Sequence, residues 1–257
     1  MAFDLWLKTS GTWINVITIF LGTALGLLLK GKLPTEMQRV ITQGLGLITL
    51  FVGSSMATSL SKATAGYVDG VILGLLAIVL GGLLGEWLQI ESGLEGIGNW
   101  LKHRFKGQGS FTEGFVAASL LFCVGPMALI GSLNNGLTGN NTIVVIKAAM
   151  DGLAALAFSS SYGIGVGFSA ISVLLYQGTL SLAAGILAQA IPDPATAPPI
   201  LLATGVGGLM ILGLGLNLLE VAKVKVAAFL PALPLAPVLY WIAIQISKLS
   251  CIRSPHC

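Results

Sequence analysis

Residues 122–152 read FCVGPMALIGSLNNGLTGNNTIVVIKAAMDG. A Cys-Val-Gly-Pro sequence interrupts an apolar run, an uncharged segment rich in asparagine and glycine follows, and Lys147 and Asp151 lie in a second apolar run. Proline lacks an N–H donor and clashes with the preceding turn, so the first run is predicted to be a broken helix. Residues four apart share one face of a helix, so the two charges are predicted to reach each other.

The composition of the whole chain places it in a lipid bilayer. Only 9% of the 257 residues are charged, 55% are hydrophobic, and the mean hydropathy is +0.92. A soluble domain carries roughly 25% charged residues to cover its surface. The 34 glycines are typical of closely packed membrane helices. The net charge of +3, without a clustered basic face, argues against binding to nucleic acid.

Patterns for metal, cofactor or enzyme chemistry are missing from the sequence. Cys123, Cys251 and Cys257 show no CxxC spacing, and the two histidines lie far apart. We find no nucleotide-binding loop, no GxSxG and no HExxH motif. We therefore expect no cofactor, no metal and no enzymatic activity.

The fold class is predicted to be all-α, a polytopic membrane helical bundle in a single domain, 1–257. A spanning helix needs about 20 mostly apolar residues. Eight segments qualify: residues 12–29, 40–60, 66–88, 111–133, 142–159, 163–190, 200–219 and 226–246. The last contains three prolines, so seven spans and a re-entrant final segment is the alternative. Residues 90–106 show amphipathic spacing, which fits a helix in the headgroup plane or a linker helix packed on the bundle.

Basic residues predict the orientation. Cytoplasmic loops are enriched in lysine and arginine. With the N-terminus outside and eight spans, most of the basic residues fall on the inner side: Lys30, Lys32, Arg39, Lys102, Arg104, Lys106, Lys223 and Lys225.

Two parts of the chain resemble each other. Residues 20–53 and 176–215 each contain Gly-Thr, an apolar stretch that ends in an aliphatic-Pro turn, and then a threonine with Gly-x-Gly. Chance similarity is the alternative in a sequence so rich in glycine and leucine. A true repeat would pair an arm at 12–88 with an arm at 163–246 in opposite orientation, as in many secondary transporters, around a central pair of spans at 111–160.

Candidate site residues gather in the central spans and at the starts of the two arms. Lys147 and Asp151 fit a charged gate or ion site, or a self-neutralising pair that only fixes packing. The helix break predicts either a simple kink or a cavity, which would be lined by Gly125, Pro126, Ser132 and Asn134. The segment from Asn134 to Asn141 fits a polar loop folded over that cavity, or an ordinary exposed turn.

Asn15 and Gln177 carry side-chain amides at membrane depth in two of the predicted spans. Their expected role is either to hydrogen-bond to a neighbouring helix or to contact a solute. The small-residue pairs Gly22/Gly26 and Gly81/Gly85 are candidate faces for a homodimer.

The sequence resembles the YqgA/YdfK family of bacterial inner-membrane proteins between residue 11 and about residue 246. The resemblance is carried by GTWINVITIFLGTALG (11–26), LLFCVGPMALIGSLNNGLTGNN (120–141) with IKAAMDG (146–152), and GLMILGLGLNLLEVAKVKVAAFLPALPLAP (208–237). It implies a multi-span, transporter-like protein of the bacterial cell membrane. It implies neither a substrate nor site residues.

Two functions remain open from the sequence. The first is a transporter or channel for a small solute or ion, with its site between the repeats. The second is a non-transporting scaffold or assembly partner in a membrane complex. A hydrated cavity that reaches Asp151 at mid-membrane would favour the first, and a dry, packed centre would favour the second.

Overall fold

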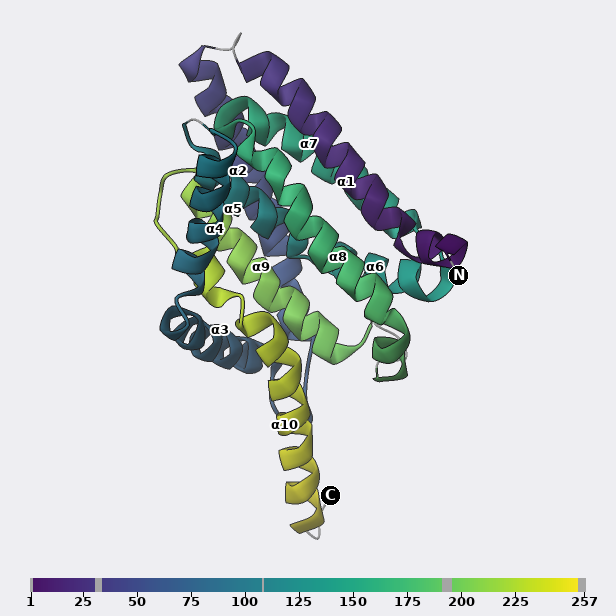
Figure 1. Ribbon diagram of the computed structural model, residues 1–257. Coiled ribbons are helices and arrows are strands. Elements are labelled where there is room, and N and C mark those ends of the chain that lie inside the picture. The colour runs from purple at the N-terminus through teal and green to yellow at the C-terminus, as the bar shows by residue number, and fades with distance from the viewer. Residues whose placement is uncertain (1, 31–33, 108, 191–195, 254–257) are drawn as a thin grey trace.

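The computed structural model describes residues 2–30, 34–107, 109–190 and 196–253 (Figure 1). The described residues form helices and turns, with one isolated β-bridge between Ala65 and Val68, which confirms the all-α prediction. In chain order the helices are α1 (Ala2–Lys30), α2 (Thr35–Ala57), the 3-10 helix η1 (Thr58–Lys62), α3 (Gly70–Trp87), α4 (Ile90–Arg104), α5 (Phe111–Cys123), α6 (Pro126–Thr138), α7 (Thr142–Tyr162), α8 (Gly165–Ala190), α9 (Pro198–Leu218), the 3-10 helix η2 (Val226–Phe229) and α10 (Ala232–Arg253).

The prediction of a multi-span bundle is confirmed. The segment that decides between seven and eight spans, however, is not the predicted one. Seven helices in the described part of the chain are long and apolar enough to cross a membrane, and Val226–Lys248, with its three prolines, is one of them. The eighth candidate is the pair α5 and α6, bent by 60° at the predicted break. The alternative count of seven therefore depends on this bent pair, and not on the final segment.

Two helix pairs form the tightest seams of the bundle, α1 with α7 and α2 with α9. On α1, a Cβ added at Gly22 would lie 2.0 Å from the carbonyl oxygen of Gly152 on α7. On α2, a Cβ at Gly53 would lie 2.7 Å from the backbone nitrogen of Leu212 on α9. Glycine is required at these contacts because any side chain would collide with the facing backbone. Such close approach is typical of membrane helices, which associate through packing because lipid supplies no hydrophobic drive. The helices α5 and α6 both pack on α8.

The glycines that the sequence offered as dimer faces are used inside the chain. Gly22 and Gly26 face α7, Gly81 faces Ala232 at the start of α10, and Gly85 faces η2, where an added Cβ would lie 1.8 Å from the Ala228 carbonyl oxygen. These faces are therefore unavailable to a second copy, and that part of the dimer prediction is wrong. A homodimer would have to use other surfaces.

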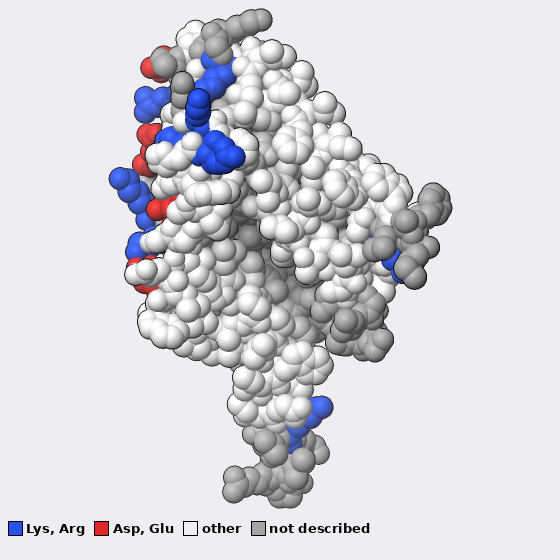
Figure 2. Space-filling view, in the orientation of Figure 1, with Lys and Arg blue, Asp and Glu red and all other residues white. Residues whose placement is uncertain are grey.

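The surface divides into an apolar belt and a charged end. Large apolar side chains of the spanning helices are exposed, such as Leu153 at 71% and Phe51 at 70%. In Figure 2 lysine, arginine and acidic side chains gather along one edge of the molecule, with few on the rest of the visible face. A broad uncharged surface of this kind is what a bilayer would cover.

The amphipathic segment at residues 90–106 forms a helix, α4. Its Gly98 and Leu101 are buried, and Thr112 at the start of α5 donates a hydrogen bond to Asn99 at 2.7 Å. The Ala228 N–H donates to Glu91 at 3.2 Å. Trp100 on the outer side is exposed. The helix thus packs on the bundle, and its position in the headgroup plane stays a prediction.

Candidate functional site

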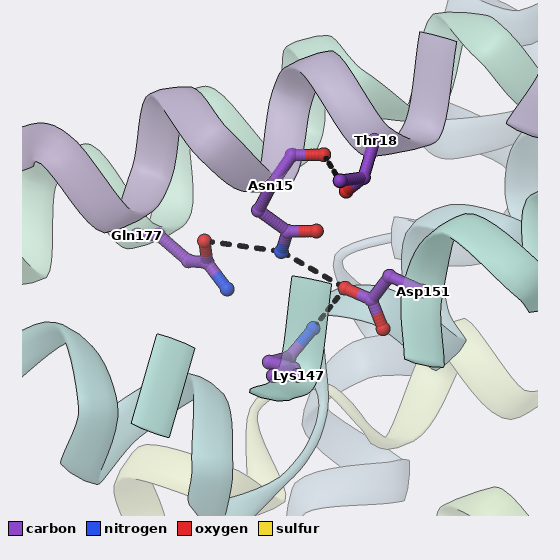
Figure 3. Close-up of polar contacts among 5 residues, drawn as sticks. All are labelled: Asn15, Thr18, Lys147, Asp151 and Gln177. Carbon is purple, nitrogen blue, oxygen red and sulfur yellow. Dashed lines mark hydrogen bonds and ion pairs between the residues drawn. The ribbon is translucent and has the colours of Figure 1, made fainter. Parts of the chain in front are cut away.

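A buried polar cluster joins three helices (Figure 3). Lys147 and Asp151 on α7 form an ion pair, and only 6% and 7% of these residues is exposed. Asn15 on α1 donates from Nδ2 to Asp151 Oδ2 at 2.9 Å and to Gln177 Oε1 on α8 at 3.3 Å. The structure therefore brings together four of the predicted site residues from distant parts of the sequence.

The glycine seam between α1 and α7 brings this cluster together. Gly152, next to Asp151, lies against Thr18 of α1, where an added Cβ would come within 3.1 Å. Thr18 donates its hydroxyl proton to the Asn15 carbonyl at 2.9 Å, which keeps that hydroxyl bonded within α1. Because Thr18 and Asn15 lie one turn apart, the contact with Gly152 places the Asn15 amide beside Asp151.

The charge on Asp151 fixes the orientation of both amides. An ionised carboxylate only accepts hydrogen bonds, so Asn15 must turn its NH₂ group toward it. The second proton of that group then faces Gln177, which must present its carbonyl oxygen. The remaining ends of the two amides, Asn15 Oδ1 and Gln177 Nε2, are buried without a hydrogen-bond partner.

The unpartnered buried side-chain atoms concentrate in one region. Among the described residues, five such atoms are found: Thr12 Oγ1, Asn15 Oδ1, Thr23 Oγ1, Ser132 Oγ and Gln177 Nε2. All five belong to α1, α6 or α8, which pack on one another. Each unsatisfied buried group costs about 1–3 kcal/mol, so their concentration in one region of the fold needs a reason.

The asparagine-rich segment differs from its prediction. Asn134, Asn135 and Gly136 continue helix α6, so the predicted polar loop over a cavity is wrong for them, and the turn is confined to residues 139–141. Asn135 is fully buried, accepts from the Gly11 N–H at 3.0 Å and donates to the Leu7 carbonyl at 2.9 Å.

Asn135 therefore fastens α6 to the start of α1. It was missed as a separate site residue. The signal was present, because Ala128, Ser132 and Asn135 follow the i, i+4, i+7 spacing of one helix face.

The predicted helix break is confirmed. Gly125 has φ 158° and ψ 155°, a combination open almost only to glycine, and α6 begins at Pro126, whose side chain lies outside the described part. Ser132 is fully buried, and Ser181 of α8 donates to its carbonyl oxygen at 3.0 Å. Asn134 and Gly125 are half-buried. Within the described part of the chain, no hydrogen bond or ion pair joins Gly125, Ser132 or Asn134 to Lys147 or Asp151.

Two clefts on the described surface lie apart from the ion pair, since neither is lined by Lys147 or Asp151. The first, of 440 Å³, lies at the charged end between α4, α5 and α9 and includes three carboxylates, on Glu91, Glu95 and Glu113. Burial raises the pKa of the Glu91 carboxyl, while hydrogen bonds from the Ala227 and Ala228 backbone act against the rise. The second, of 480 Å³, is an apolar groove between α1 and α8.

The fold and the cluster together define a multi-span helical membrane protein with a charged pair buried among its spans. The chain belongs to the family described as "Protein of unknown function (DUF554)", whose match covers residues 10–241. It is 32% identical to "Uncharacterized protein YqgA" of Escherichia coli (strain K12), over 88% of this chain and 94% of that protein. It is 28% identical to "Uncharacterized membrane protein YdfK" of Bacillus subtilis (strain 168), over 90% of this chain and 96% of that protein. No solved structure matches the chain.

Proposed function

We propose that this protein is a transporter or channel for a small solute or ion, and that its site is the cluster of Lys147, Asp151, Asn15 and Gln177. The observation that carries the proposal is the buried ion pair, which is bonded to an amide that retains an unused acceptor. Ionisable groups among membrane helices are costly and usually serve a pathway. A bundle that needed only packing would place apolar side chains here at lower cost.

The arrangement of the arms supports a site between inverted repeats. The helices α1, α2 and α3 each contact the helix that the repeat would pair with it, α8, α9 and α10. In Figure 1, α1 rises from the N-terminal end while α8 descends, and α2 and α9 also run in opposite directions. Inverted arms that meet along their helices commonly enclose a site near the middle of the bilayer.

Uptake into vesicles tests the proposal. The purified protein would be reconstituted and a panel of small solutes and ions offered under proton and sodium gradients, with empty vesicles as the control. At least one solute is expected to enter faster with the protein present. Asp151→Asn is expected to abolish that uptake, because it removes the charge that orients the cluster. A normal rate in this variant would remove Asp151 from the mechanism.

A second function has an observation of its own in its favour. The four side chains of the cluster, those of Lys147, Asp151, Asn15 and Gln177, are nearly or fully buried, and neither surface cleft is lined by Lys147 or Asp151. A closed centre is what a scaffold or assembly partner would have. A transporter in an occluded state would share it, so the uptake measurement separates the two.

We further propose that the charged end faces the cytoplasm of a bacterial cell, with the N-terminus outside the cell (inner) membrane. This orientation follows the positive-inside rule. The structure places exposed Asn140 in the turn between α6 and α7, and exposed Lys223 in the connection after α9.

Cysteine labelling tests that orientation. With the native Cys123, Cys251 and Cys257 replaced, Asn140→Cys is expected to react with an impermeant maleimide on intact spheroplasts. Lys223→Cys should react only after the membrane is opened. The reverse pattern would place the N-terminus inside.

A further inference from the structure

The groove between α1 and α8 has the size and lining of a small-molecule site. Its 480 Å³ falls within the range of roughly 300–1,000 Å³ that is usual for ligand pockets. Apolar side chains from both helices line it, and at one end Trp6 and Trp13 stack with ring centroids 6.3 Å apart. None of its lining residues is charged, and the apolar ones include Trp6, Trp13, Leu174, Leu175 and Leu182.

Thr12 gives this groove a polar point that the protein does not satisfy. It lines the groove, only 1% of it is exposed, and its hydroxyl has no hydrogen-bond partner among the described residues. A threonine in a helix usually donates to a carbonyl of the preceding turn, as Thr18 does on the same helix. Thr12 lacks this bond and lies beside an open groove. A ligand in the groove would supply the hydrogen-bond partner that its buried hydroxyl lacks.

The groove runs beside the polar cluster. Thr12 lies one helical turn before Asn15, and Gly178 follows Gln177 directly on α8. A Cβ added at Gly178 would meet nothing within 4 Å, so the two helices leave open space at this level. In Figure 1, α1 and α8 lie side by side along the outside of the bundle, so their seam lies at the surface of the protein.

We propose that this groove binds a membrane amphiphile with a single apolar chain and an uncharged polar head. The chain would lie against Trp6, Trp13 and the leucines of α8, and the head would hydrogen-bond to Thr12. An uncharged head follows from the lining, because a charged head would be buried there without a counter-ion. The ligand would enter sideways from the bilayer. The binding site does not depend on whether the protein transports anything.

A second copy of the chain is a poorer occupant of the groove. Filling it with a helix would bring apolar side chains against Thr12 and leave its hydroxyl unsatisfied. Bulk phospholipid would fill the groove without saturation. The two alternatives therefore predict different outcomes in a labelling experiment.

Photolabelling of the reconstituted protein tests the site. The probe is a monoacylglycerol with a diazirine in its chain, offered in phosphatidylcholine vesicles, and labelled peptides are located by mass spectrometry. Labelling of peptides that contain residues 6–13 and 174–182 is expected to saturate and to be competed by unlabelled monoacylglycerol. A free fatty acid, ionised at the pH of the assay, should compete less well.

Two variants separate the groove from general contact with lipid. Thr12→Val keeps the volume and removes the hydroxyl, so the half-saturating probe concentration is expected to rise about three- to tenfold, the value of one hydrogen bond. Gly178→Phe fills the groove and is expected to abolish saturable labelling. Gly44→Phe on α2, where a Cβ also meets nothing within 4 Å, should leave labelling unchanged.

Three results would overturn the proposal. Labelling that rises linearly with probe and resists competition would show annular lipid only. Cross-links from this groove to a second copy would assign the surface to a dimer. Unchanged half-saturation in Thr12→Val, with both variants eluting as folded protein, would show that the hydroxyl takes no part.

Discussion

Asp151→Ala is expected to destabilise the folded protein by about 3–5 kcal/mol, because it leaves the Lys147 ammonium buried without its partner. It also removes the acceptor that orients Asn15. The loss should appear as a lower midpoint of thermal unfolding in detergent, followed by size-exclusion chromatography. The control is Glu86→Ala, which breaks the exposed pair with Lys225 and should change the midpoint little.

The paired substitution Lys147→Met with Asp151→Asn separates stability from function. Both charges are removed together, and the new amide oxygen still accepts the hydrogen bond from Asn15. Replacing a buried ion pair by neutral groups is often without cost, so the unfolding midpoint should return close to that of the unchanged protein. Uptake should remain absent. A stable double variant with full uptake would show that the pair only holds the helices together.

Gly22→Leu is expected to prevent the bundle from assembling. The first added atom would lie 2.0 Å from the Gly152 carbonyl oxygen and 2.9 Å from its carbon. These are backbone atoms, so no rotamer change relieves the collision, and α1 must move away from α7. Overpacking costs typically about 1–3 kcal/mol where side chains adjust, and more is expected here.

The measurement is the yield of monodisperse protein extracted from membranes. Gly44→Leu on α2 is the matched control, since it makes the same change where a Cβ meets nothing within 4 Å. Equal yields from the two variants would contradict the close approach of α1 and α7.

The sequence predicted two kinds of feature: those that follow a regular residue spacing, and those marked by a sudden change of residue type. Apolar runs of spanning length gave the helices, the Gly-Pro pair at 125–126 gave the bend, and the four-residue spacing of Lys147 and Asp151 gave the ion pair. Such features depend on local backbone geometry, which neighbouring residues largely determine.

Features that depend on which helices meet could not be predicted. The Asn15 and Gln177 amides meet because α1, α7 and α8 converge, and no sequence spacing encodes that distance. Asn135 was assigned to a loop because consecutive asparagines favour turns, whereas tertiary hydrogen bonds to Leu7 and Gly11 hold it in a helix. The glycine faces were assigned to dimer contacts because small residues show that helices approach, but not which helices.

The glycine seam between α1 and α7 restricts how the molecule could ever move. Where one backbone rests on another, sliding by even a fraction of a turn would bring Gly22 or Gly26 against a bulkier neighbour. Helices α1 and α7 are therefore expected to move as one rigid body, which keeps Asn15 and Asp151 in fixed register. Any rocking that uncovers the ion pair would therefore have to occur on the side of α8, which carries Gln177, because Asn135 fastens α6 to α1.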